Sequence, residues 1–101
     1  MGLHSLIGIM VRKSTPQKKI KEVKEQFEYA LEKAMVVKEY DIISNNITMD
    51  GNIEIRYNLE INNMIREKIK HAFNNISDYE IWTNYKNDDG EIIFKIDVKN
   101  H

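Results

Sequence analysis

The chain contains no cysteine, a single proline and four glycines among its 101 residues. Without cysteine, a disulfide scaffold, a thiolate metal site and a thiol nucleophile are all excluded. So little glycine and proline is not typical of a linker or a low-complexity segment. The longest apolar run covers residues 6–11, far short of the ~20 residues that span a bilayer. We therefore expect no membrane-spanning segment, and no motif indicates a cofactor.

Charge of one sign is also missing, because 15 Lys and Arg face 16 Asp and Glu, for a net charge of -1. A general nucleic-acid coat or a polybasic membrane binder needs a strongly basic chain. The hydrophobic share of 42% is too high for a disordered chain. No basic segment precedes the apolar run as it would in a signal peptide, so we expect a cytoplasmic protein. Ile, Lys and Asn, all encoded by AT-rich codons, make up 39 residues, which suggests a low-GC bacterium or a mobile element.

Hydrophobic periodicity predicts one domain over residues 1–101, built from a strand at residues 4–12 and two α-β-β units at about 15–60 and 61–99. Ser14, Thr15 and Pro16 favour a helix start. Apolar residues then recur every three or four positions to about residue 38, and again from about residue 62 to 76. Asp-Gly at Asp50 and Asp89 predicts two hairpin turns, each between alternating strands.

The two units resemble each other in sequence. With a shift of 39, the hairpins match at Tyr40, Ile42, Asn45, Asp50, Gly51 and Ile53. With a shift of 38, the apolar stripes of the two helices coincide as well. A period of about forty residues favours an internal duplication.

The predicted fold class is α+β with the order β-α-β-β-α-β-β, an antiparallel five-stranded sheet carrying both helices on one face. Its first six elements follow the ferredoxin-like pattern. One plausible strand order is 5-4-1-3-2. The repeat suggests a rival order, 1-4-5-3-2, and the sequence does not choose between them.

Two-residue hairpin loops would pair residues whose numbers sum to 101 in the first hairpin and to 179 in the second. Ile55 would then face Asn46, and Phe94 would face Tyr85. This register puts the tyrosines at 40, 57, 79 and 85 on the helix-covered side. The face without helices would carry Ile43, Ile47, Met49, Trp82 and Ile93, with Asn45, Arg56, Asn84, Lys86 and Lys95 between them.

That predicted face leads to the first functional hypothesis. Aromatic residues and arginine are enriched in protein interfaces, and an uncovered apolar sheet face is easily used for pairing. We predict partner-binding residues at Trp82, Ile43, Ile47, Met49, Ile93, Arg56 and Lys95. The alternative is that these residues are scattered or covered within the chain. Self-association as a homodimer is the simplest form of such binding.

A basic cluster lies where the first strand passes into the first helix, at Arg12, Lys13, Lys18, Lys19 and Lys21. The positive end of a helix dipole would add to it, so an anionic partner could bind there. The alternative is a solvated helix end. Together with Trp82, Arg56, Lys86 and Lys95 this cluster carries a second hypothesis, a nucleic-acid-binding module.

Other chemistry finds little support. The Asp-Gly turns lack the acidic residue at position twelve of a calcium loop, because Tyr57 and Ile96 stand there. His4, His71 and His101 have no metal-ligand spacing. No nucleotide-binding or hydrolase motif is present. We therefore expect a small non-catalytic interaction protein, such as a regulator or inhibitor, binding through its free sheet face or edge. A small-molecule or enzymatic site between sheet and helices is a third hypothesis.

Overall fold

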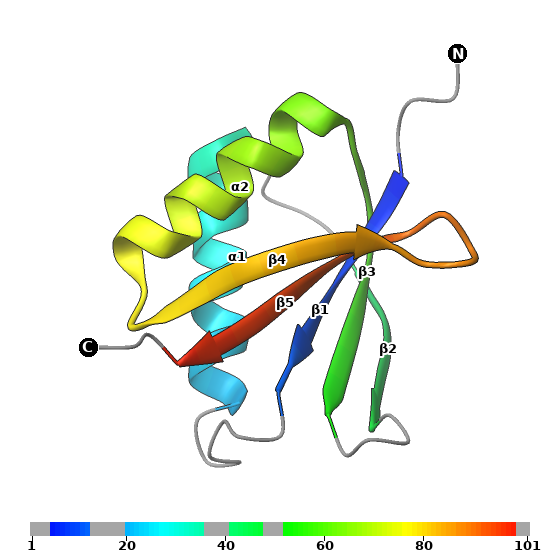
Figure 1. Cartoon of the computed structure of the whole chain (residues 1–101), viewed down its shortest axis with the longest axis horizontal. Coiled ribbons are helices and arrows are strands. Elements are labelled where there is room, and N and C mark those ends of the chain that lie inside the picture. The colour runs from blue at the N-terminus through cyan, green and yellow to red at the C-terminus, as the bar shows by residue number, and fades with distance from the viewer. Residues whose placement is uncertain (1–4, 13–19, 36–40, 48–51, 99–101) are drawn as a thin grey trace.

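The computed structural model describes residues 5–12, 20–35, 41–47 and 52–98, with only the backbone given for 35 and 43–47. The elements are β1 (Ser5–Val11), α1 (Ile20–Met35), β2 (Ile42–Ile47), β3 (Ile53–Ile61), α2 (Asn63–Ile76), β4 (Tyr79–Lys86) and β5 (Ile92–Val98). The predicted α+β class and element order are confirmed. In Figure 1 the strands lie in front of α1.

The sheet has the order β2-β3-β1-β5-β4 within the described residues. β1 runs antiparallel to β3 but parallel to β5, so the sheet is mixed and the prediction of an all-antiparallel sheet is wrong. Both predicted strand orders are wrong as well, because β5 and not β4 lies beside β1. β5 is the more apolar strand of its hairpin, with four of its seven residues buried, and an inner position suits such a strand.

The strand order is symmetrical about β1. The inner strands β3 and β5 flank it, and β2 and β4 form the two edges. Ile55 and Phe94 are 39 positions apart, and both pair with Ile9 at the centre of β1. A twofold axis through Ile9 would therefore bring one hairpin onto the other.

The core lies between the sheet and the two helices. The Phe27 ring of α1 is at its centre, 5.6 Å from the Tyr57 and Phe94 rings and 6.1 Å from the Phe73 ring. All four side chains are fully buried. The Tyr57 hydroxyl donates a hydrogen bond to Glu28 at 3.2 Å, which satisfies the polar end of this buried ring. Both helices thus cover one face of the sheet, as the periodicity predicts.

The ends of α2 fix its position. Asn62 caps the helix N-terminus by accepting a hydrogen bond from the Ile65 amide at 2.9 Å. At the other end the Ser77 amide donates to the Phe73 carbonyl. The buried Ser77 hydroxyl donates to Gln26 of α1 and accepts from the Tyr79 amide. Ser77 therefore connects both helices to the start of β4.

The hairpin registers differ from the predicted ones. Ile55 pairs with Asn45 instead of Asn46, and Phe94 pairs with Asn84 instead of Tyr85. In the second hairpin the cause is the turn: the Asn87 amide donates to the Glu91 carbonyl, and Gly90, with φ of 79°, donates to the Asn87 carbonyl. Three residues, 88–90, thus form the loop where two were expected.

Candidate functional site

The face of the sheet opposite the helices, here called the open face, carries the even-numbered residues of β1 and β3 and the odd-numbered residues of β5. Across β1 and its neighbours one row reads Arg56, Gly8, Ile93 and Tyr85, and the next reads Glu54, Met10, Lys95 and Thr83. One-residue changes in register move side chains between faces. They decide which predicted partner-binding residues belong here.

Tyr85 is on the open face, so its predicted place on the helix-covered side is wrong. It pairs with Ile93, and its side chain is exposed. Burial of part of the phenol raises the pKa of Tyr85 above its ordinary value, and the nearby Glu54 carboxylate raises this pKa further. Asn84 and Lys86, predicted for the open face, pair with Phe94 and Ile92 of the helix-covered side. Lys86 is therefore not part of the open face.

Trp82 lies on the open face as predicted. It sits where the β4–β5 register shifts between Ile81 and Thr83, and it is 42% exposed. The Arg12 guanidinium lies 5.0 Å from the centre of the Trp82 ring, and the Lys95 ammonium lies 5.3 Å from it. Both distances are within the range of cation–π attraction.

Lys95 connects Trp82 to Tyr85. Its ammonium is 5.1 Å from the centre of the Tyr85 ring. Arg12, Trp82, Lys95 and Tyr85 thus form a continuous set of contacts, here called the cation–aromatic row. Arg12 is also paired with Asp97 at 3.4 Å. The row presents two exposed rings and two cations on a helix-free surface.

Ile93 was predicted as an exposed contact, and this is wrong. It lies on the open face but is fully buried. Gly8 is its neighbour on β1, and a Cβ at Gly8 would lie 3.1 Å from the Ile93 Cδ1 atom. The missing side chain at position 8 thus leaves the space that Ile93 fills.

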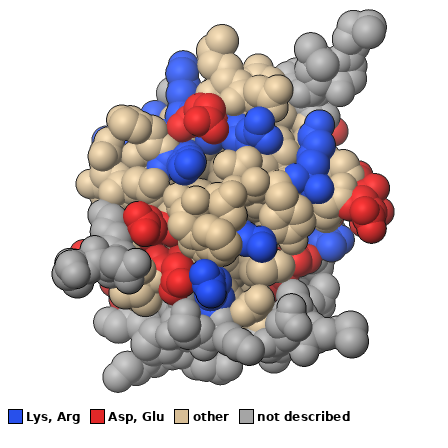
Figure 2. All heavy atoms as spheres, viewed as in Figure 1, with Lys and Arg blue, Asp and Glu red and all other residues tan. Residues whose placement is uncertain are grey.

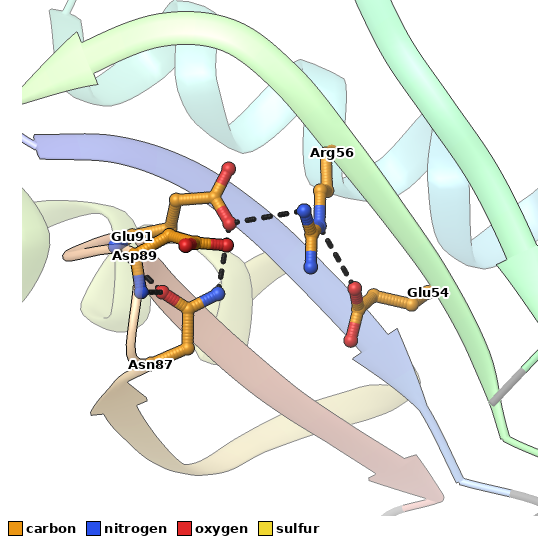
Figure 3. Close-up of polar contacts among 5 residues, drawn as sticks. All are labelled: Glu54, Arg56, Asn87, Asp89 and Glu91. Atoms are coloured by element: carbon orange, nitrogen blue, oxygen red, sulfur yellow. Dashed lines mark hydrogen bonds and ion pairs between the residues drawn. The ribbon is translucent and has the colours of Figure 1, made fainter. Parts of the chain in front are cut away.

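Arg56, which pairs with Gly8, links β3 to the second hairpin across the open face. Its guanidinium pairs with Glu54 at 2.9 Å on its own strand and with Glu91 at 3.3 Å. Figure 3 shows the contact to Glu91 crossing β1. Asn87 extends the network, since its amide donates to Glu91 at 2.8 Å and its oxygen accepts from the Asp89 amide. The hydrogen bond to Glu54 and the charge of Glu91 raise the pKa of Arg56 despite its partial burial.

The first hairpin contributes less than predicted. The register pairs Ile47 with Ile53, which packs against the core on the helix side, so the predicted place of Ile47 on the open face is wrong. Ile43 falls at the irregularity between Ile42 and Ser44. Met49 lies outside the described residues.

The predicted anion site is described only at its ends. Arg12 belongs to the open face, and Lys21 is exposed on the first turn of α1. Lys13, Lys18 and Lys19 lie outside the described residues, so the cluster as a whole stays a prediction. Figure 2 shows basic and acidic side chains scattered among uncharged ones on this side of the molecule.

The charge balance of the open face bears on what it can bind. Its carboxylates outnumber its cations among the described residues: Glu54, Glu60, Glu80, Glu91 and Asp97 against Arg12, Arg56 and Lys95. Both arginines are already paired with carboxylates. A surface that follows a phosphate backbone needs the opposite balance.

Two other features bear on ligand chemistry. A hollow lies between the two helices, lined by Lys33, Ala34, Glu67, Lys68, His71 and Ala72, and not between the sheet and the helices as the third hypothesis requires. The described residues bring no three His, Asp or Glu side chains together as a metal-binding group. Within the same residues, neither helix is long and apolar enough to cross a bilayer.

Comparisons with family models, with curated proteins and with solved structures found no match to this chain.

Proposed function

We propose that this protein is a non-catalytic interaction module that binds a protein partner through the open face of its sheet. The observation that carries the proposal is the cation–aromatic row. Trp82 and Tyr85 remain exposed on a surface that no helix covers, and cations contact both rings. Tryptophan, tyrosine and arginine are the residues enriched among interface hot spots.

The charge of the open face supports a protein partner over nucleic acid. A phosphate backbone laid on this face would meet Glu54, Glu91 and Asp97, and each of its arginines would first have to leave a carboxylate. A protein partner can instead offer charges of both signs and match such a mixed pattern. The same ion pairs support a non-catalytic role, because Glu54 and Glu91 are held by Arg56 instead of being free to transfer protons.

The experiment compares matched tyrosines on the two sides of the molecule. Tyr29 of α1 is exposed, and Lys33 lies 5.2 Å from its ring centre, just as Lys95 lies 5.1 Å from that of Tyr85. The partner would be captured from the native host with and without nuclease, identified, purified and titrated against each variant. Trp82→Ala and Tyr85→Ala should weaken binding by about tenfold or more, and Tyr29→Ala should not.

Two results would overturn the proposal. If Tyr29→Ala weakens binding as much as Tyr85→Ala does, the partner does not use the open face. If nuclease abolishes the capture and an oligonucleotide quenches Trp82 fluorescence, the nucleic-acid alternative is correct. The cytoplasmic location stays a prediction.

We further infer that the chain arose by duplication of an α-β-β unit. The strand order is symmetrical about β1. Ile53 pairs with Ile47 and Ile92 pairs with Lys86, and each residue of the second pair is 39 positions after its counterpart in the first. The same shift relates Ile55 and Phe94, which share Ile9 as partner. The register thus supports the repeat that the sequence suggests.

A further inference from the structure

The edge of the sheet formed by β4 is closed by side chains of α2 and of the turn that follows it. The Asn74 amide group donates to the Ile81 carbonyl at 3.3 Å, and its oxygen accepts from the Ile81 amide at 2.7 Å. The Ser77 hydroxyl accepts from the Tyr79 amide at 3.0 Å. These groups would otherwise be free to pair with another strand. Glu80 and Lys86 also put charges on this edge.

The opposite edge, formed by β2, differs from this one in sequence. No strand among the described residues pairs with its outer side. The position that corresponds to Asn74, 38 residues earlier, is Val36, which has no side-chain hydrogen-bonding group; the one that corresponds to Lys86, 39 residues earlier, is Ile47. The two edges are therefore equivalent in topology but differ in sequence at these positions, although Asp41, the counterpart of Glu80, keeps a charge just before β2.

The composition of β2 is unusual for an edge strand. Residues 42–47 read Ile-Ile-Ser-Asn-Asn-Ile and contain no Asp, Glu, Lys or Arg. The other uncharged strand in the described chain is β1, at the centre of the sheet. Exposed edge strands of monomeric proteins usually carry charges or proline that prevent pairing.

We propose that β2 pairs antiparallel with β2 of a second copy of this chain, so that the two sheets join into one. A twofold axis places residues of the same strand opposite each other. Charged residues near such an axis would face like charges, and this strand has none. Asn45 and Asn46 suit the axis, because an amide carries both a donor and an acceptor. A partner of different sequence would not require this self-complementarity.

The lack of cysteine makes a direct test possible. Ser44→Cys, Asn45→Cys and Asn46→Cys would be made one at a time and mildly oxidised. A disulfide needs Cα atoms about 4.4–6.8 Å apart, so only positions beside the axis can link two copies. Asn84→Cys is the matched control, since position 84 on β4 corresponds to position 45 on β2. We expect linked dimers from one or two neighbouring β2 positions and none from position 84.

Mass measurement in solution gives a second readout. Light scattering should show a dimer that dissociates on dilution, with a dissociation constant of roughly micromolar or weaker because one strand pair is a small interface. Asn45→Lys should give a monomer, whereas Asn84→Lys should leave the dimer intact. Circular dichroism checks that both variants fold.

A monomer at about 1 mM overturns the proposal, and so does linkage through position 84 that is as efficient as linkage through β2. The outcome is separate from that for the open face, since Trp82→Ala should not alter the dimer. If the dimer persists in Asn45→Lys, a different surface holds the two copies together and the assignment to β2 is wrong.

Discussion

Gly8 is the position at which a single added methyl group tests the packing of the open face. A Cβ there would lie 3.0 Å from the Ile55 carbonyl oxygen and 3.1 Å from the Ile93 Cδ1 atom. The first of these atoms belongs to the backbone of the neighbouring strand and cannot rotate away. The second belongs to a fully buried side chain. Gly8→Ala therefore forces either the β1–β3 pair or Ile93 to move.

The expected cost follows from two opposing effects. Overpacking of a tight site costs about 1–3 kcal/mol. Replacing glycine by alanine restricts the unfolded chain and returns about 0.4–1 kcal/mol. The free energy of unfolding, measured with urea, should fall by about 1–2 kcal/mol. In a chain of about 100 residues this corresponds to a melting temperature lower by roughly 4–16 °C.

A double-mutant cycle identifies the atom responsible. Ile93→Val removes Cδ1 and should cost about 0.5–1.5 kcal/mol in the wild-type chain. In the Gly8→Ala background the same change removes the clash, so its cost should fall towards zero. Ile96→Val is the control, because Ile96 is equally buried but belongs to the core cluster on the helix side, and its effect should add.

The reasoning would be refuted if Gly8→Ala left stability unchanged, or if Ile93→Val cost the same in both backgrounds. The first result would mean that the strands separate freely enough to admit a methyl group. The second would mean that the strain lies wholly against the Ile55 carbonyl.

Three further predictions concern the turn, the closed edge and the phenol. Gly90→Ala should lower the free energy of unfolding by about 1–2 kcal/mol, because φ at this turn is 79°; Gly90→Asn should cost less, and equal costs would contradict the conformational argument. Asn74→Ala should lower the free energy of unfolding by about 0.5–1.5 kcal/mol. It should also speed hydrogen exchange of the Ile81 amide, which donates to the Asn74 side-chain oxygen at 2.7 Å; unchanged exchange would show that this hydrogen bond is not formed in solution. The absorbance titration of Tyr85, obtained by difference from Tyr85→Phe, should have a midpoint above the ordinary pKa of about 10, since burial and Glu54 raise this pKa. Folding then favours the neutral phenol, so this contribution to stability is complete below the unfolded-state pKa and is lost as pH rises through the folded-state pKa. Glu54→Gln should lower the midpoint, and a wild-type midpoint at or below the ordinary value would contradict the argument.

The sequence predicts the helices and the core well because their signal is local. Phe27, Leu31, Ile69 and Phe73 recur at helical spacing, and all four are buried. A stripe of this kind can be recognised in the sequence without knowing which distant segments pack against it. Strand neighbours are different, since the order of elements along the chain does not state which strand of a hairpin lies inside.

The faces of β4 show why the site is only partly predictable. The three-residue turn moves Tyr85 to the open face, because one added residue in the loop exchanges the faces. The irregularity between Ile81 and Thr83 adds a second shift of one residue, and this restores the expected face for Tyr79 and Ile81. Trp82, which lies within the irregularity, also stays on its expected side. The prediction for Trp82 thus succeeds although the register behind it is wrong.

The packing beneath the open face also limits what a partner can gain there. Ile93 is already buried and Gly8 has no side chain, while Arg56 crosses β1 to reach Glu91. A partner on this face would therefore cover mainly the Trp82 and Tyr85 rings and the stems of Arg12 and Lys95, and little aliphatic surface. Binding that buries little apolar area has a small heat-capacity change. Since the chain already encloses its core without a partner, the proposed complex should form and dissociate between folded molecules, and calorimetry at several temperatures should show a heat-capacity change far smaller than that of coupled folding.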